Sequence, residues 1–562
     1  MSVAPTSGIA FDPRLSRRGF LAAGIAGGFA LAGCGHSNPP AAGTSDAMAA
    51  AIAAAETRRP HSGRTVNAAL TPQQVEIDLG GPIVRTTAFG NTIPGPLIRA
   101  TVGDEVVVAV NNRLDRPTSV HWHGIALRND MDGAEPATPN IAGGQSFTYR
   151  FSVPDAGTYW AHPHVGLEED LGLYLPFIVD SPTEAGRYDH EWIVVLDDWT
   201  DGAGKSPQQL YDELKSPNKP PMTTMTTTTA TSPTTSTTST TSTTSTTSTT
   251  STTPTSSTTS TTGTTSTTGT TSTTPTSSPS GMPATPGGEV GTSDLLGGDA
   301  GDIAYPYYLI NGRIPTAPTT FTAKPRQRIR IRFINAASDT TFRVALAGHA
   351  MTVTHTDGYP VLPTRVDALL IGMAERYDVI VTAADGVFPL VAAAEGKNAV
   401  ARALLSTGSG SPPDPQFRPV QFAGLVGTVD MFTATTAVNL GRPDPGLDLP
   451  VVLGGNMEKY EWIINGEPYS RTKPLHVQQG QRPTLTFDNP TMMYHPMHLH
   501  GHTFQVIKAD GTPGPRKDTV IVLPKQKVRA VLVADNPGLW VMHCHNTYHL
   551  FAGMETRLDY TV

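Results

Sequence analysis

Short apolar runs separated by turn-forming residues make up most of this chain. Val, Ile and aromatic residues fill the runs, while Gly, Asp, Asn or Pro bound them, a pattern that predicts β-strands. The clearest predicted strands are residues 106–110, 147–151, 329–333, 379–381, 528–533 and 539–542. No long helical period stands out. Repeated short strands at this spacing therefore predict an all-β protein built of sandwiches.

One pattern of polar and apolar positions occurs three times. Each copy begins with a polar turn, continues through an apolar strand and reaches an asparagine nine residues after the turn begins: Asn112, Asn335 and Asn489. Self-similarity of this kind indicates one domain repeated along the chain. We therefore expect three related β-domains.

The first 61 residues depart from this pattern. Ser16 to Leu21 (SRRGFL) resembles a twin-arginine export signal, and the apolar run after it is too short to span a bilayer. Leu31 to Cys34 (LAGC) resembles a lipobox, so we expect residues 1–34 to be a lipoprotein signal and Cys34 to anchor the protein to the membrane, on the exported, periplasmic side of the cell envelope. Cleavage near Ala32, which releases a soluble protein, is the alternative. Residues 35–61 are rich in Ala, Ser and Pro and predict a flexible tether.

A second departure is a Thr/Ser/Pro tract between Met222 and Ser280, which contains almost no apolar residues. Such a tract cannot bury enough surface to offset its ordering entropy, so we expect a disordered insert over about residues 215–297. Solvated disorder is favoured over an O-glycosylated stalk, which has a similar composition.

Length and charge add two limits. The chain has 562 residues, enough for three or four domains. A net charge of −8 gives no electrostatic reason to expect nucleic acid as a partner. We expect a monomer that acts on small molecules.

The histidines supply the candidate chemistry, because four His-x-His pairs occupy equivalent positions in the first and third copies. The pairs are His121/His123, His162/His164, His498/His500 and His543/His545. Residues i and i+2 of a strand point to one face, so each pair presents two imidazoles side by side. Imidazole is a good ligand for copper, whereas a single such pair would more often be an ordinary core or surface feature. The middle copy carries Val344, Leu346, Val391 and Ala393 at these positions.

Cys544 lies between the histidines of the last pair and therefore points to the opposite face of the strand. His549 and Met554 follow it, and His495 lies upstream. Two histidines, a thiolate and a weak axial thioether are the ligands of a blue-copper electron-transfer site. The alternative for a free cysteine is a small buried hydrophobe, which would leave these neighbours unexplained.

Together the four motifs HWHG (121–124), HPH (162–164), HPMHLH (495–500) and HCH…H…M (543–554) resemble those of the multicopper oxidases. With its N-terminus, the chain is similar to the mycobacterial-type copper-resistance lipoproteins of that family. The resemblance implies three consecutive cupredoxin-like Greek-key β-sandwich domains, over residues 62–182, 183–424 and 425–562.

The resemblance also implies four copper ions per chain. Its type 1 copper would be bound by His495, Cys544, His549 and axial Met554. Its type 2 copper would be bound by His121 and His498, one type 3 copper by His123, His162 and His545, and the other by His164, His500 and His543. The resemblance further implies that electrons cross Cys544 to His543 or His545 one at a time, and that four of them reduce O2 to two waters.

Protons and substrate are less well specified. Asp132 matches an acidic position that the family places near the cluster, although Asp132-Gly133 is equally explained as a turn. Many bacterial relatives carry an acid directly after the last type 1 histidine, where this chain has Leu550. Met493, two residues before His495, matches a position that copper-oxidising relatives use, although a methionine in a strand more often packs in a core.

We therefore expect an oxidase that couples oxidation of Cu(I), and also of phenols or aromatic amines, to O2 reduction in copper resistance. A laccase with an organic substrate is the alternative within the same chemistry. A copper-binding envelope protein without turnover would be expected to have lost ligands, and a small electron carrier would leave the four histidine pairs unexplained.

Overall fold

The computed structural model describes residues 45–183, 188–217 and 290–562. The signal with Cys34, the first part of the predicted tether and the Thr/Ser/Pro tract lie outside these ranges. Strands dominate the described residues, and each of the six predicted strands is present, which confirms the all-β class. No described helix is both long and apolar enough to cross a membrane.

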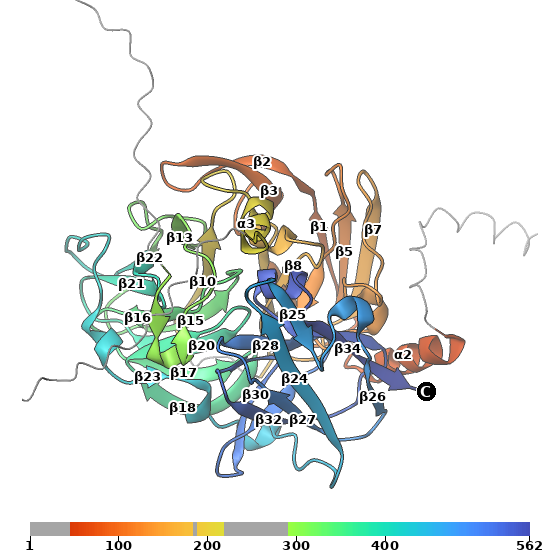
Figure 1. Cartoon of the computed structure of the whole chain (residues 1–562). Helices are drawn as coiled ribbons and strands as arrows, with labels where there is room; N and C mark the ends of the chain where they lie inside the picture. The colour runs from red at the N-terminus through yellow and green to blue at the C-terminus, as the bar shows by residue number, and fades with distance from the viewer. Residues whose placement is uncertain (1–44, 184–187, 218–289) are drawn as a thin grey trace, which may run out of the picture. The chain divides into compact units, whose positions relative to one another are not determined.

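The first domain has two main sheets and a hairpin (Figure 1). One sheet has the order β1 (Thr65–Leu70), β5 (Glu105–Asn111), β7 (Ser146–Ser152). The other has the order β4 (Ile98–Thr101), β9 (Leu175–Asp180), β8 (Gly157–His162), β6 (His121–His123). The hairpin joins β2 (Pro72–Asp78) to β3 (Ile83–Phe89). Apolar side chains from both sheets, such as Val108 and Phe177, form the core between them.

The middle domain contains two six-stranded sheets. The first runs β13 (Tyr307–Ile310), β10 (His190–Trp199), β15 (Arg328–Asn335), β20 (Arg376–Thr382), β17 (Met351–Thr356), β18 (Tyr359–Val366). The second runs β14 (Thr320–Thr322), β22 (Ala399–Ser406), β21 (Val387–Ala394), β16 (Phe342–Leu346), β19 (Ala368–Ile371), β23 (Val426–Gly427). β23 joins this sheet although residue 425 was the expected start of the third domain.

The third domain has a six-stranded and a five-stranded sheet. The six strands are β25 (Glu461–Ile464), β24 (Asp448–Asn456), β27 (Thr484–Asp488), β32 (Lys527–Leu532), β29 (Phe504–Ile507) and β30 (Pro513–Lys517). The five are β26 (Leu475–Gln478), β34 (Glu555–Thr561), β33 (Leu539–Cys544), β28 (His495–Leu499) and β31 (Thr519–Val522).

Helices in the described ranges are few and short. The α-helices are α2 (Asp46–Arg58), α3 (Pro207–Leu214) and α4 (Thr547–Phe551). The 3-10 helices are η1 (Asn129–Met131), η2 (Glu168–Asp170), η3 (Asp294–Leu296), η4 (Val420–Ala423), η5 (Val429–Met431), η6 (Thr436–Val438) and η7 (Tyr469–Arg471). A further strand pair joins β11 (Thr292–Ser293) to β12 (Gly298–Asp299).

The repeated asparagine has the same structural role in all three copies. Asn112, Asn335 and Asn489 are fully buried, and each side-chain amide donates to at least two main-chain oxygens while its oxygen accepts the N–H two residues later. Each Asn therefore closes the loop that follows its strand, because a buried amide needs all of these partners. In the middle copy the residues that replace histidine, Val344 and Val391 among them, are buried in the hydrophobic interior.

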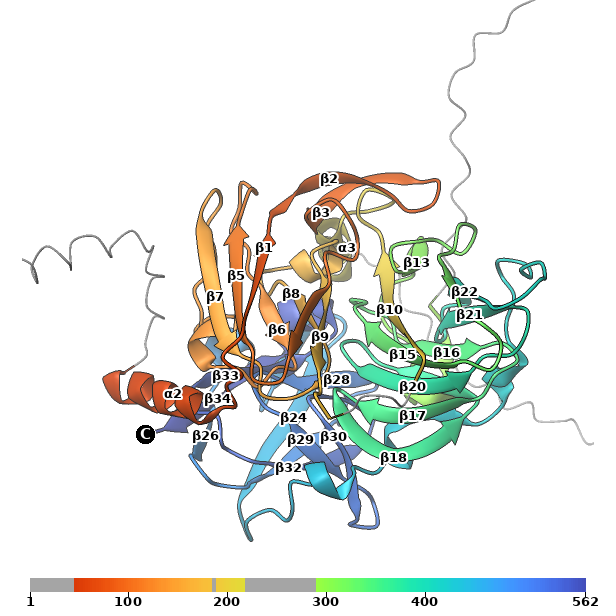
Figure 2. The same cartoon turned by 180° about the vertical axis from the view of Figure 1, so that it is seen from behind.

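Two predictions of disorder are wrong at their edges. Residues 46–58 of the predicted tether form the helix α2 (Figures 1 and 2). This helix is capped by the Ser45 hydroxyl and anchored by buried Met48 and Ile52. These two side chains are four residues apart and share one helix face, which gives the alanine-rich segment a surface to pack. In the second case, residues 292–296 of the predicted insert form β11 and η3, and Leu296 is fully buried against Leu370 and Met373.

We predict that Ile52→Ala releases α2 from the folded body. Removing a buried isoleucine side chain costs about 2–5 kcal/mol, which is enough to free a single helix. Hydrogen exchange of the α2 amides should therefore accelerate by about tenfold or more. Ala53 is exposed on the same helix, so Ala53→Ser should leave exchange nearly unchanged. Equal exchange rates in the two variants would show that the helix does not depend on this contact.

Candidate metal centre

Paired strands bring the histidine pairs together within each domain. In the first domain β6 pairs with β8 so that His121 lies opposite His162. In the third domain β28 pairs with β33 so that His498 lies opposite His543. Figure 2 shows these four strands close to one another. Of the pairs expected on strands, only the first lies wholly within one. His500 and His545 directly follow the last residues of β28 and β33, and His164 lies two residues beyond the end of β8.

His495, Cys544 and His549 form one compact ligand group. The Nδ1 atoms of the two histidines are 3.1 Å apart, and the Cys544 sulfur lies 3.7 Å from each of them. All three residues are buried, as is Met554. A cysteine sulfur and two imidazole nitrogens that converge on one point in a buried site are suited to a transition metal with thiolate affinity.

The far nitrogens of these two histidines are held by the protein. Nε2 of His549 donates to Asp302 at 2.9 Å, Nε2 of His495 lies 3.0 Å from the Thr491 hydroxyl, and the Trp462 ring covers His549 at 4.1 Å between centroids. Burial alone would lower the pKa of His549, but the Asp302 carboxylate and the Cys544 sulfur raise it to about 10 in the metal-free protein. Such partners fix the orientation of a ligating imidazole.

The other eight histidines form a single cluster between the first and third domains. Three groups of ligand atoms, each within 4.8 Å of one another, are His121/His123/His498, His123/His162/His545 and His164/His500/His543. Within them, Nδ1 of His123 is 3.4 Å from Nε2 of His162, and the Nε2 atoms of His500 and His543 are 3.1 Å apart. The rings of His121 and His500 stack at 3.7 Å, as do those of His123 and His498.

Unpartnered nitrogens show that the cluster fits a metal. Nε2 of His121, His164, His498 and His545 is buried without a hydrogen-bond partner in the structure. For His121 and His498, Nδ1 lies 2.9 Å from a main-chain oxygen, so the proton belongs on that nitrogen and Nε2 carries the lone pair. Burial lowers the pKa of His164 to about 3, which keeps its ring neutral. Inward lone pairs on neutral imidazoles are the donors that copper requires.

Asp132 is part of the cluster wall. Its carboxylate lies 2.8 Å from Nδ1 of His500 and its main-chain oxygen 2.9 Å from Nδ1 of His121, and burial raises the pKa of the carboxyl group. Gly133 has φ +87, and a Cβ there would collide with the Val120 carbonyl oxygen. The acidic and the turn interpretation of Asp132-Gly133 are therefore compatible.

Three acids at these sites were not found from the sequence. Asp302 contacts His549, Asp518 contacts His123 at 3.1 Å, and Oε1 of Glu169 lies 3.0 Å from Nδ1 of His545. None of the three acids lies within a sequence motif that contains the histidine it contacts. The available signals were indirect: Glu168-Glu169-Asp170 is a run of acids shortly after His164, and Asp518 precedes the apolar run at residues 520–523.

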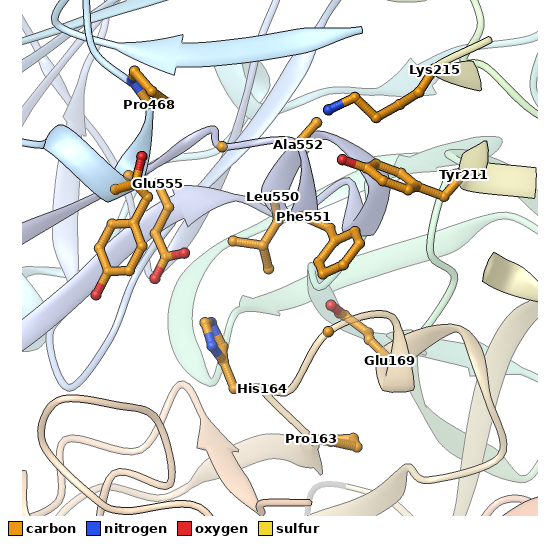
Figure 3. Close-up of a pocket in the computed structure, with 14 residues that line it drawn as sticks. Pro163, His164, Glu169, Tyr211, Lys215, Pro468, Leu550, Phe551, Ala552 and Glu555 are labelled. Atoms are coloured by element: carbon orange, nitrogen blue, oxygen red, sulfur yellow. The ribbon is translucent and has the colours of Figure 1, made fainter. Parts of the chain in front are cut away.

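A cavity of about 380 Å³ borders the cluster at His164 (Figure 3). Its lining includes His164, Glu169, Leu550 and Glu555, which Figure 3 shows facing one space. Leu550 occupies the position where an acid was expected, and burial raises the pKa of nearby Glu555 to about 8. Two carboxyl groups on other elements therefore line the space beside Leu550.

The two methionines before His495 have opposite environments. Met493 is 3% exposed and belongs to the main hydrophobic core, whereas Met492 is 67% exposed. The Met493 carbonyl oxygen accepts the Asn489 amide that closes the loop after β27. Its backbone thus has a structural role beside His495.

Comparisons with known proteins agree with this arrangement. Three models of the family "Multicopper oxidase" match residues 71–184, 289–410 and 442–561. The chain is 69% identical to multicopper oxidase MmcO of Mycobacterium tuberculosis, over 99% of each chain.

The chain belongs to the multicopper oxidase family. It is an oxidoreductase of the kind that uses copper and O2, as the histidine motifs predicted. This multicopper oxidase is also 28% identical to a copper resistance protein A homolog of Pseudomonas syringae pv. tomato, with 87% of this chain and 92% of the relative covered. Its fold resembles that of the laccase from Botrytis aclada, with a TM-score of 0.64 and 22% identity over 90% and 89% of the two chains. The three-domain cupredoxin-like fold is thereby confirmed.

We predict that this multicopper oxidase, when free of metal, loses stability as the pH falls below about 6.5. Burial lowers the pKa of His164 to about 3 and that of His498 to about 4, so in this range the unfolded chain binds protons that the folded chain does not. The loss is on the order of 3 kcal/mol for each histidine. Urea unfolding between pH 7 and pH 4 measures it.

Matched variants separate this effect from general acid denaturation. His164→Gln should flatten the pH profile, whereas exposed His476→Gln should leave it unchanged. Identical profiles for His164→Gln and the parent protein would contradict the prediction.

Proposed function

We propose that this multicopper oxidase holds four copper ions and couples one-electron oxidation of a small reductant to reduction of O2 to water. The observation that carries the proposal is the set of buried, unpartnered imidazole nitrogens from two domains, beside a separate His2Cys group. When bound, copper at these sites would supply one-electron redox chemistry and O2 binding. His495, Cys544, His549 and Met554 would hold the type 1 ion.

The remaining histidines would hold the other three ions. His121 and His498 would bind the type 2 ion, and the two type 3 ions would be bound by His123, His162 and His545 and by His164, His500 and His543. The first type 3 set and the second each combine both domains, so neither domain would bind the trinuclear cluster alone.

The strand β33 supports electron transfer between the two sites. The Cys544 sulfur belongs to the His2Cys group, while its neighbours His543 and His545 belong to the cluster. The Cys544 carbonyl oxygen also accepts a hydrogen bond from Nδ1 of His543 at 2.9 Å. A few covalent bonds and one hydrogen bond therefore join the sites.

A small reductant fits the enclosed His2Cys group better than a bulky one. His495 is 0% and His549 1% exposed, which leaves an aromatic substrate almost no imidazole edge to touch. We therefore propose Cu(I) as the physiological substrate, with phenols and aromatic amines as slower ones and Met493 as the docking residue. The relative named for copper resistance supports this role.

A role in copper resistance is consistent with export of this protein. The twin-arginine motif and the lipobox support export and a lipid anchor at Cys34, with the enzyme on the outer side of the membrane. A laccase with an organic substrate is the second candidate, supported by the resemblance to the fungal enzyme.

Cys544→Ser tests the catalytic part of the proposal. The parent protein should bind four copper ions, show a strong visible thiolate-to-copper band and consume O2 when given a reductant. The variant should lose the band and one copper ion, because serine does not replace the thiolate. Its O2 consumption should fall to that of copper-free protein. A parent protein that binds copper without consuming O2 would instead indicate a non-catalytic copper-binding role.

Met493→Ala tests the substrate. The variant should lower kcat/KM for Cu(I) more than that for a phenol, because only the metal ion uses a thioether ligand. Exposed Met492→Ala is the matched control and should change neither value. Equal losses for both substrates would assign Met493 to packing, and a parent enzyme that prefers the phenol would favour the laccase alternative.

A further inference from the structure

Asp518, which directly follows β30, joins the two domains at the copper cluster. Nε2 of His123 in the first domain donates to Oδ1 of Asp518 at 3.1 Å, and Nδ1 of His498 in the third domain donates to its main-chain oxygen at 2.9 Å. These two histidines form one of the two stacked pairs. Asp518 therefore bridges the stacked pair His123/His498 across the two domains, as Asp132 bridges the stacked pair His121/His500.

The contact with Asp518 sets the tautomer of His123. An ionised carboxylate only accepts hydrogen bonds, so the ring proton of His123 must be on Nε2. The lone pair is then on Nδ1, which faces Nε2 of His162 at 3.4 Å. His121 and His498 have the opposite arrangement, with Nδ1 bonded to the protein and Nε2 facing inward.

A cation of the middle domain holds Asp518 in place. Nη1 and Nη2 of Arg376, the first residue of β20, donate to the two carboxylate oxygens at 2.6 Å each. Both side chains are 0% exposed, and Nε of Arg376 donates to the Thr158 carbonyl oxygen of β8 at 3.1 Å. A two-pronged pair of this kind fixes orientation as well as position. One middle-domain side chain thus contacts both metal-binding domains.

Asp132 and Asp518, which each bridge one stacked histidine pair, differ in the charged side chains around them. Among the described residues no Lys or Arg forms an ion pair with Asp132, whereas Asp518 has the Arg376 guanidinium. Both carboxylate oxygens of Asp518 accept from the guanidinium, so the side chain is held as a hydrogen-bond acceptor.

Gly124 makes room for this ion pair. It follows His123 with φ +85, and a Cβ there would collide with Nη2 of Arg376 and lie 2.6 Å from Oδ2 of Asp518. The last residue of the HWHG motif is thus explained by the Arg376–Asp518 pair, which lies against the end of β6.

We propose that Arg376 is a positioning residue for the copper cluster, acting through Asp518 on His123 and His498. The proposal rests on the proposed function, since it takes these two histidines as copper ligands. The middle domain carries no histidine pairs of its own, yet through Arg376 it completes the cluster that the other two domains form.

Arg376→Lys tests the proposal, because lysine keeps the positive charge but cannot donate to both carboxylate oxygens in the geometry of the guanidinium. Copper affinity of the cluster should fall by about 10–100-fold, as is usual when a partner of a metal ligand is lost. The EPR signal of the type 2 copper should change, and the visible band of the type 1 copper should remain. Chelator competition followed by a metal count, together with both spectra, measures this.

Arg332→Lys is the matched control. Arg332 is also buried in the middle domain, and its hydrogen-bond partners Glu191, Thr158 and Asp378 are not among the proposed copper ligands. The Arg332→Lys variant should therefore bind copper with the affinity of the parent protein. If Arg376→Lys also retains full copper affinity and the parental type 2 signal, the proposal is wrong.

Gly124→Ala provides a second, independent disturbance of the ion pair. It keeps both residues of the ion pair in the sequence, but the added Cβ pushes their side chains away from the end of β6. The same selective loss of cluster copper is therefore expected. If Arg376→Lys does not fold, a folded Gly124→Ala protein with parental copper binding overturns the proposal. A folded parent protein that lacks cluster copper altogether would instead contradict the proposed function.

Discussion

The structure depends on holding neutral imidazoles from two domains face to face in a dry interior. Eight such rings meet between the first and third domains, and burial lowers the pKa of several of them far enough to keep them uncharged. Without a metal this arrangement is unfavourable, because buried nitrogen lone pairs remain unpartnered. The fold must therefore provide enough packing and hydrogen bonding around the cluster to maintain it.

That support comes from all three domains. Asp132 and Asp518 each join a histidine of the first domain to one of the third, and Arg376 of the middle domain holds Asp518. The equivalent asparagines show that the middle domain shares the common loop geometry, while apolar residues occupy its positions equivalent to the paired histidines. The middle domain contributes structure where the other two contribute ligands.

Much of this could be predicted from the sequence, because it is local. The His-x-His pairs, the residues around Cys544 and the spacing to each asparagine lie within short segments whose periodicity shows which side chains share a face. Helix α2 was missed because its alanine-rich composition resembles a linker, and only Met48 and Ile52 indicate a packed face. Asp518, Asp302 and Arg376 were missed for a different reason. Their partners lie in other domains, hundreds of residues away in some cases, and no spacing records such contacts.

The central claim is that the first and third domains share one metal cluster, which β33 connects to the site at Cys544. Anomalous diffraction at the copper absorption edge from crystals of the copper-loaded protein tests it most directly. The account predicts one peak among His495, Cys544 and His549 and three peaks enclosed by the eight histidines of the cluster. Copper bound within a single domain, or an empty space between the first and third domains, would contradict it.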